Sequence, residues 1–117
     1  MQRKTIRNHK DFLTERGALR VSDDCFSIIV KEAKIPADAR FGLVTPKKVF
    51  KLAVDRNRAK RVIRDWIAFN EKLMLNNLDY IFILREPILH LGRDQGRKKM
   101  QLKLKRLEKI YSADVSK

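Results

Sequence analysis

Hydrophobic and polar positions along the chain follow two periodic patterns, one typical of strands and one typical of helices. Residues 24–31, 40–45 and 80–85 are short apolar runs rich in β-branched and aromatic side chains, and each is a predicted strand. The first two are expected to pair antiparallel across a turn at residues 34–39. A further short strand near residues 18–21 would extend the same sheet.

Three other segments repeat apolar residues at the spacing of amphipathic helices, namely residues 9–16, 53–75 and 94–111. The asparagines at 76–77 are expected to end the second helix, and Gly96 is expected to fray the start of the third. The order α–β–β–α–β–α contains one β–α–β crossover. This mixture of elements predicts an α+β fold, built as a two-layer α/β sandwich.

The two sides of the helix predicted over 53–75 differ in chemistry. At about 100° per residue, one stripe is apolar and is expected to face the sheet, with Trp66 in the core. That stripe comprises Ala59, Val62, Ile63, Trp66, Phe69 and Leu73. The opposite side, which we call the cationic arc, comprises Arg56, Asn57, Lys60, Arg61 and Arg64. Arg58 lies apart, near the back edge of the helix.

The cationic arc contains no acid between Arg56 and Arg64. A solvated helix face usually mixes Glu with Lys, because opposite charges four residues apart stabilise a helix and like charges destabilise it. A polyanion would supply the missing negative charge. Arginine dominates the arc, and its planar guanidinium matches phosphate oxygens and guanine edges. The arc is therefore predicted to bind a polyanion.

Composition supports a nucleic-acid partner. The 117 residues are expected to form one domain, with a basic arm at 1–7 and a polar tail at 112–117. They include 28 Lys and Arg and 14 acids, which gives a net charge of +14 and points to a polyanionic partner. No apolar run approaches the roughly 18 residues that span a bilayer, so no membrane is expected. Without a signal peptide, and with Cys25 as the single cysteine, the chain is expected to be cytoplasmic.

Residues for independent catalysis are missing from the sequence. There is no Gly-rich phosphate loop, and no serine lies in a hydrolase motif. Asp23 and Asp24 are adjacent, so on a strand they would point to opposite faces. His9 and His90 have no other ligands at metal-binding spacing. Neither catalysis by this chain alone nor a transition-metal site is predicted.

Two features leave alternatives open. Phe12 and Phe26 can stack on unpaired bases or belong to the core, and the core is favoured for Phe26 because a strand face must pack on something. The last predicted helix carries cations around most of its circumference, which fits diffuse phosphate contact and plain solubility equally. These cations are Arg93, Arg97, Lys98, Lys99, Lys103, Lys105, Arg106 and Lys109.

Two runs of residues resemble the signature of the bacterial ribonuclease P protein subunit. The run Arg40-Phe-Gly-Leu-Val-Thr-Pro-Lys-Lys is similar to the Arg-x-Gly-Leu-x-x-x-Lys-Lys strand of that family. The run Arg56-Asn-Arg-Ala-Lys-Arg-Val-Ile-Arg is similar to its RNR helix. An early helix with Phe12 and an Asp-initiated strand ending at Arg85 also match, so the resemblance covers about residues 5–110.

The resemblance implies both a fold and a function. The fold would be similar to the second domain of ribosomal protein S5, with a left-handed βαβ crossover. The chain would be the protein subunit of an endoribonuclease that removes the 5′ leader from precursor tRNA in tRNA processing. Its partners would be ribonuclease P RNA, as the catalytic subunit, and precursor tRNA, with no protein partner implied. Mg²⁺ would be bound mainly by the partner RNA, and the chain alone would be inactive.

The resemblance also assigns residues to roles. RNA binding falls to Arg56, Asn57, Arg58, Lys60, Arg61 and Arg64. A cleft for the leader would use Phe12, Phe26, Ile29 and Lys48. Further phosphate contacts are expected from Arg40, Lys47 and Lys51.

Three positions depart from the family pattern. A second aromatic residue is usual where this chain has Arg16, Ile29 replaces another aromatic residue, and Pro46 stands where small residues are common. Leader contacts would thus depend less on stacking and more on charge and apolar contact. The alternative function is a non-catalytic ribosomal RNA-binding or ribosome-assembly protein, and a protein-only nuclease is a third.

Overall fold

A computed structural model describes residues 4–5, 19–32, 40–75 and 77–115 of the chain. The helix predicted over 9–16, with Phe12, lies outside the described residues, and so does the turn predicted at 34–39. No helix in the described ranges is both long enough and apolar enough to cross a membrane.

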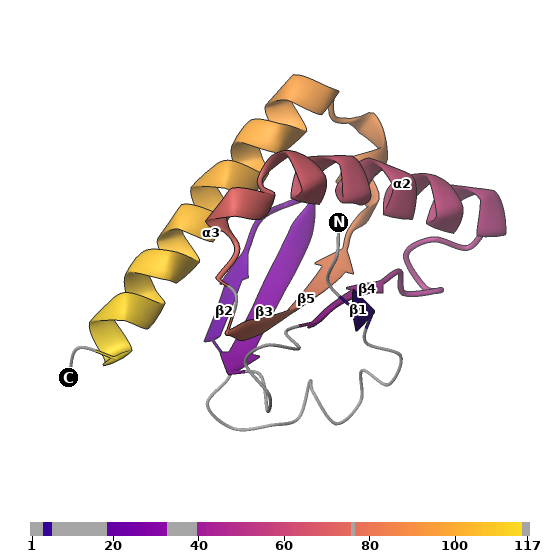
Figure 1. The fold of residues 1–117 in the computed structure, drawn as a ribbon. Coiled ribbons are helices and arrows are strands. Elements are labelled where there is room, and N and C mark those ends of the chain that lie inside the picture. The colour runs from indigo at the N-terminus through magenta and orange to yellow at the C-terminus, as the bar shows by residue number, and fades with distance from the viewer. Residues whose placement is uncertain (1–3, 6–18, 33–39, 76, 116–117) are drawn as a thin grey trace.

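The described strands form one five-stranded sheet in the order β1-β4-β5-β3-β2 (Figure 1). They are β1 (Lys4–Thr5), β2 (Leu19–Ser22), β3 (Phe26–Glu32), β4 (Arg40–Val44) and β5 (Leu78–Leu84). β2 confirms the short strand expected near residues 18–21, and it pairs antiparallel with β3.

The antiparallel pairing predicted between β3 and β4 is wrong, because β5 lies between them. β5 runs antiparallel to β3, with Ile28 opposite Phe82, and parallel to β4, with Gly42 opposite Ile81. Almost every side chain of β5 is buried, on both faces of the sheet. A strand that is apolar on both faces removes most apolar surface from water in the middle of a sheet, and this favours β5 for the central position.

The helical segments are α2 (Ala53–Phe69), the short 3₁₀ helices η2 (Glu71–Leu73) and η3 (Glu86–His90), and α3 (Arg93–Val115). The long helices α2 and α3 both pack on one face of the sheet, which confirms the two-layer α+β sandwich (Figure 1). α2 connects β4 to β5, two parallel neighbours, as the predicted crossover requires. The left hand of that crossover stays a prediction.

The core lies between the sheet and the two helices. Phe26, Ile28 and Val30 of β3 face it, and the ring of Phe26 meets Trp66 edge-on at 6.3 Å between centroids. The predicted apolar stripe of α2 is confirmed at its centre by Ala59, Ile63 and Trp66, and Ile67 joins them. Phe69 is an exception, since it is 59% exposed.

Gly96 does not fray α3, contrary to expectation. It lies in the first turn of α3 and is buried against the Trp66 indole, where an added Cβ would approach Trp66 Cε2 far too closely for two carbon atoms. The missing side chain therefore lets α3 lie directly on α2. This close approach fixes the crossing of the two helices.

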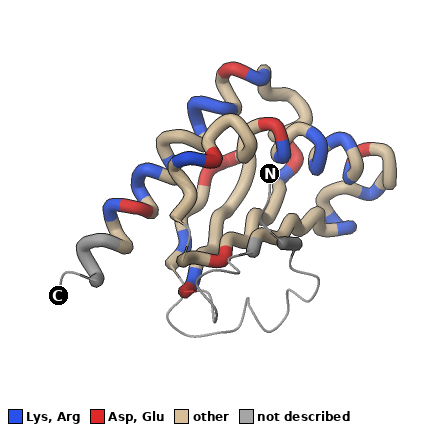
Figure 2. Tube along the Cα trace, viewed as in Figure 1, with Lys and Arg blue, Asp and Glu red and all other residues tan. Residues whose placement is uncertain are grey.

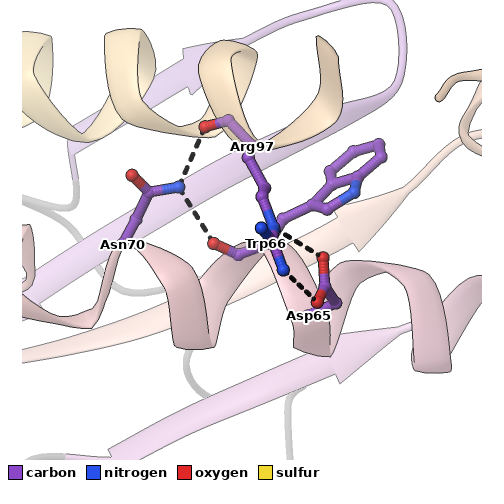
Figure 3. Close-up of polar contacts among 4 residues, drawn as sticks. All are labelled: Asp65, Trp66, Asn70 and Arg97. Carbon is purple, nitrogen blue, oxygen red and sulfur yellow. Dashed lines mark hydrogen bonds and ion pairs between the residues drawn. The ribbon is translucent and has the colours of Figure 1, made fainter. Parts of the chain in front are cut away.

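Polar contacts also lock α2 against α3 (Figure 3). α2 ends at Phe69, six residues before the predicted end, and the next residue, Asn70, is buried. Its Nδ2 donates to the carbonyl oxygens of Trp66 and Arg97, both at 2.9 Å. Arg97 in turn donates to both carboxylate oxygens of Asp65, at 3.0 and 2.9 Å. The guanidinium carbon of Arg97 lies 4.4 Å from the Phe69 ring centroid, which explains how that exposed ring is held.

Candidate nucleic-acid interface

The cationic arc of α2 faces away from the sheet, on the side opposite Ile63 and Trp66. Arg61 and Arg64 are exposed and Lys60 is half-buried, and basic residues follow one another along α2 in Figure 2. Within the described residues, no ion pair joins these three cations to a carboxylate. The part of the chain that the structure describes thus supplies no carboxylate to compensate their charge.

The two remaining arginines of the RNR run are partly engaged by backbone oxygens. Arg56 Nη1 donates to the carbonyl oxygen of Phe50 at 2.8 Å and to that of Lys51 at 3.3 Å. Arg58 Nη2 donates to the carbonyl oxygen of Leu89 at 3.0 Å, on the side where Arg58 was expected to lie apart. A guanidinium has five N–H donors, so each side chain keeps donors for a ligand while it anchors a neighbouring loop.

Asp65, the acid within the second half of α2, is occupied by Arg97. The hydrogen bonds from Arg97, together with its charge and that of Arg93, hold the pKa of the Asp65 carboxyl below its usual value. Asp65 is therefore ionised and paired across the helix contact rather than along α2. Sequence reasoning missed this pair because Asp65 and Arg97 are 32 residues apart. The one signal for it was a single acid, Asp65, directly after a run of cations.

A basic loop precedes α2. Lys47, Lys48 and Lys51 are exposed in it, and buried Phe50 anchors it while its N–H donates to the carbonyl oxygen of Pro46. These three lysines extend the positive surface from the N-terminal end of α2, as expected for phosphate contacts. Arg40 begins β4, and its side chain is outside the described residues.

One of the four residues expected in the leader cleft, Phe26, lies in the core instead. Phe26 is fully buried in the core and cannot stack on a base, so its assignment to the cleft is wrong and the core reading is right. Ile29 lies three residues further along β3 and hence on the opposite sheet face, where it packs with Ile81. Lys48 is exposed in the loop before α2, and Phe12 lies outside the described residues. Of the three described residues, Phe26 lies in the core, Ile29 on the other sheet face and Lys48 in the loop before α2.

The fold and this surface define a small basic α+β sandwich protein whose helix α2 carries a cationic face without carboxylate partners among the described residues. The chain belongs to the Ribonuclease P family, whose model matches residues 1–108. It is 35% identical over 78 residues to the ribonuclease P protein component of Vibrio campbellii, a match that covers 67% of this chain and 64% of that protein. The match to the Pseudomonas entomophila component is 49% identical over 49 residues, covering 42% and 36%.

Solved structures agree with this assignment. The chain is similar to the RNase P protein of Thermotoga maritima, with a TM-score of 0.72 and 25% identity over 89% of this chain and 97% of that one. A mutant RNase P protein of Staphylococcus aureus gives the same TM-score and identity, covering 89% and 87%. In sequence, the matched stretch spans less than two thirds of each of the two curated relatives described above.

Proposed function

We propose that this chain is the protein subunit of ribonuclease P, an endoribonuclease that removes the 5′ leader of precursor tRNA. The observation that carries the proposal is the cationic arc of α2, which has no counter-charge among the described residues and lies on the fold of the ribonuclease P proteins. The arc supplies a polyanion site, and the family indicates that ribonuclease P RNA is the polyanion. A cytoplasmic location belongs to the same proposal.

The arc would act by positioning and by charge. Because α2 is packed through Ile63 and Trp66, the guanidinium groups of Arg61 and Arg64 project from a rigid backbone. Their charges offset repulsion among RNA phosphates, which lowers the electrostatic cost of bringing RNA and precursor tRNA together. Contacts of this kind position the protein on RNA without reading its sequence.

Catalysis is assigned to the RNA, with Mg²⁺ held mainly there. Among the described residues, the one group of three that could hold a metal is Asp23, Asp24 and Cys25. Lys99 Nζ already lies 3.2 Å from Asp23 and 2.9 Å from Asp24, and its charge opposes a bound cation. This group does not fit a catalytic magnesium site, and it lies at the β2–β3 turn rather than on α2.

The leader is proposed to bind away from the core, with Phe12, Ile29 and Lys48 as candidates. Phe26 is no longer one of them because it is buried. Phe12→Ala is expected to weaken binding of leader-bearing precursor more than binding of mature tRNA. Equal losses for both RNAs would remove Phe12 from the leader site.

Reconstitution tests the proposed function. The purified protein is added to its cognate ribonuclease P RNA at low Mg²⁺, with precursor tRNA as substrate. Restored leader cleavage supports the proposal. Indifference to the protein would indicate a ribosomal RNA-binding or ribosome-assembly role, and cleavage by the protein without RNA would indicate a nuclease.

A further inference from the structure

A cavity of about 300 Å³ lies beside the cationic arc, between α2 and the segment that leads into α3. It is lined by Arg61, Val62, Asp65, Trp66, Leu91 and Arg93. Arg61 belongs to the arc, so the cavity continues the positive surface around α2 toward α3.

The lining combines apolar walls with a positive rim. Val62 and Leu91 are half-buried and pack against the core, and they provide apolar surface. Arg61 and Arg93 are both exposed. The one acid in the lining, Asp65, has both oxygens bonded to Arg97 and is thereby neutralised. An anionic group at the rim would thus meet two arginines without net repulsion from the carboxylate.

Trp66 forms the inner wall of the cavity. The residue is fully buried, and the ring edge that carries Nε1 lies against Gly96, in the first turn of α3. An occupant of the cavity therefore meets the apolar walls and the arginines of the rim.

On these grounds, and resting on the proposed function, we infer that the cavity receives one unpaired nucleotide of the RNA partner. The phosphate lies between Arg61 and Arg93, and the base packs on Val62 and Leu91. The volume is at the lower end for sites that bind small organic groups, so it suits one base. A free anion would use the arginines and leave the apolar walls empty.

A charge-matched pair of variants tests the position of the site. Arg93→Ala removes an exposed cation of the cavity rim, and Lys98→Ala removes an exposed cation of α3 that does not line the cavity. Affinity for cognate ribonuclease P RNA is expected to fall about tenfold for Arg93→Ala and less than about twofold for Lys98→Ala. Equal effects of the two variants would overturn the inference.

Arg64→Ala, measured in parallel, separates this inference from the proposed function. Arg64 belongs to the arc but does not line the cavity. If Arg64→Ala weakens RNA binding and Arg93→Ala does not, the cavity fails as a site and the arc stands. If neither variant weakens binding, the proposed function itself fails.

Crosslinking tests the ligand. A photo-crosslinker on Arg93→Cys would sit at the rim of the cavity, and the same group on Lys109→Cys would sit more than four turns further along α3. Native Cys25 is buried and would remain unlabelled. We expect the Arg93→Cys protein, at saturating concentration, to react with one unpaired nucleotide of the RNA and Lys109→Cys not to reach it. Reaction only with paired nucleotides would overturn the inference.

Removing the base distinguishes a held nucleotide from a held phosphate. An RNA with an abasic site at the crosslinked nucleotide is expected to bind the wild-type protein several-fold more weakly. Unchanged affinity would show that only the phosphate is bound, and the nucleotide pocket would be wrong.

Discussion

The helices α2 and α3 are both basic, but they use their cations differently. On α2, Lys60, Arg61 and Arg64 have no carboxylate partner in the described structure. On α3, Arg97 pairs with α2 and Lys99 pairs with the β2–β3 turn. Hydrogen bonds to Asp24 and Asp23 raise the pKa of Lys99, so this cation is committed to the fold. Two cations of α3 are thus committed to assembly of the fold, while three cations of α2 have no carboxylate partner in the described structure.

The largest effect is expected from a substitution that disrupts the contact between Gly96 of α3 and Trp66 of α2. Gly96→Ala would force a Cβ into the Trp66 indole, and such overpacking costs about 1–3 kcal/mol of unfolding free energy, here at the upper end. Gly92→Ala is the matched control, because beyond the adjacent residues the nearest atom to its Cβ would be Gln95 Oε1, at 3.9 Å. Urea unfolding of both variants checks this. Equal stabilities would show that the glycine contact does not control the packing of α3 on α2.

The second effect concerns the arc directly. Arg64→Ala is expected to lower affinity for ribonuclease P RNA about tenfold and to reduce the salt slope of binding by about one, with unfolding unchanged. Lys99→Ala removes the same charge from α3 and is expected to lower the melting temperature while leaving RNA affinity nearly unchanged. Binding titrations across a salt series, with thermal melts of both proteins, measure the contrast. The reverse pattern would contradict the division between the helices.

A smaller effect tests how α3 holds α2. Arg97 lowers the pKa of Asp65, so their pair stabilises the fold above the unfolded pKa of about 3.9 and loses that contribution as the pH falls through the lower folded pKa. Arg97→Ala should therefore be less stable than wild type at pH 7, with a deficit that shrinks in acid. Asp65→Asn should show a similar deficit, and the double variant should lose less than the sum. A deficit independent of pH would assign the effect to packing over Phe69 alone.

The smallest expected effect concerns alkylation of Cys25, which should not occur in the native protein. Burial raises the pKa of the Cys25 thiol to about 11, and the negative charge of Asp24 adds to this. Thiolate is the reactive form, so iodoacetamide at pH 8 should leave the native protein unmodified and label it only in denaturant. Mass spectrometry after timed exposure checks the outcome. Rapid native labelling would mean that the β2–β3 turn opens despite its Lys99 contacts.

Sequence reasoning succeeded where the pattern is local. The apolar stripe and the arc of α2 follow from the helical repeat alone, since Ala59, Ile63 and Trp66 return to one side at that period. The strand positions followed from runs of β-branched residues for the same reason. Whether the arc binds RNA is a separate question that the proposed experiments address.

Features that depend on distant residues could not be predicted. α2 ends at Phe69, and the Nδ2 of the next residue, Asn70, donates a hydrogen bond to the carbonyl oxygen of Arg97, 27 residues away. β5 follows α2 in the chain, yet it lies between β3 and β4 in the sheet because it is apolar on both faces. The alternation of side chains along a strand places Phe26 and Ile29 on opposite faces of the sheet. Which of the two faces α2 covers is known only from the structure, where Trp66 of α2 contacts Phe26.

The late arrival of the central strand has a consequence for synthesis on the ribosome. β3 and β4 emerge first, and neither has the neighbour that will hydrogen-bond to both until β5 has left the exit tunnel. Until then α2 has no complete sheet to rest on, and its basic side chains project from a segment without a fixed orientation. A nascent chain of this protein therefore cannot hold α2 in its final position until β5, which ends at Leu84, has joined the sheet. The RNA site proposed above would thus form only late in synthesis.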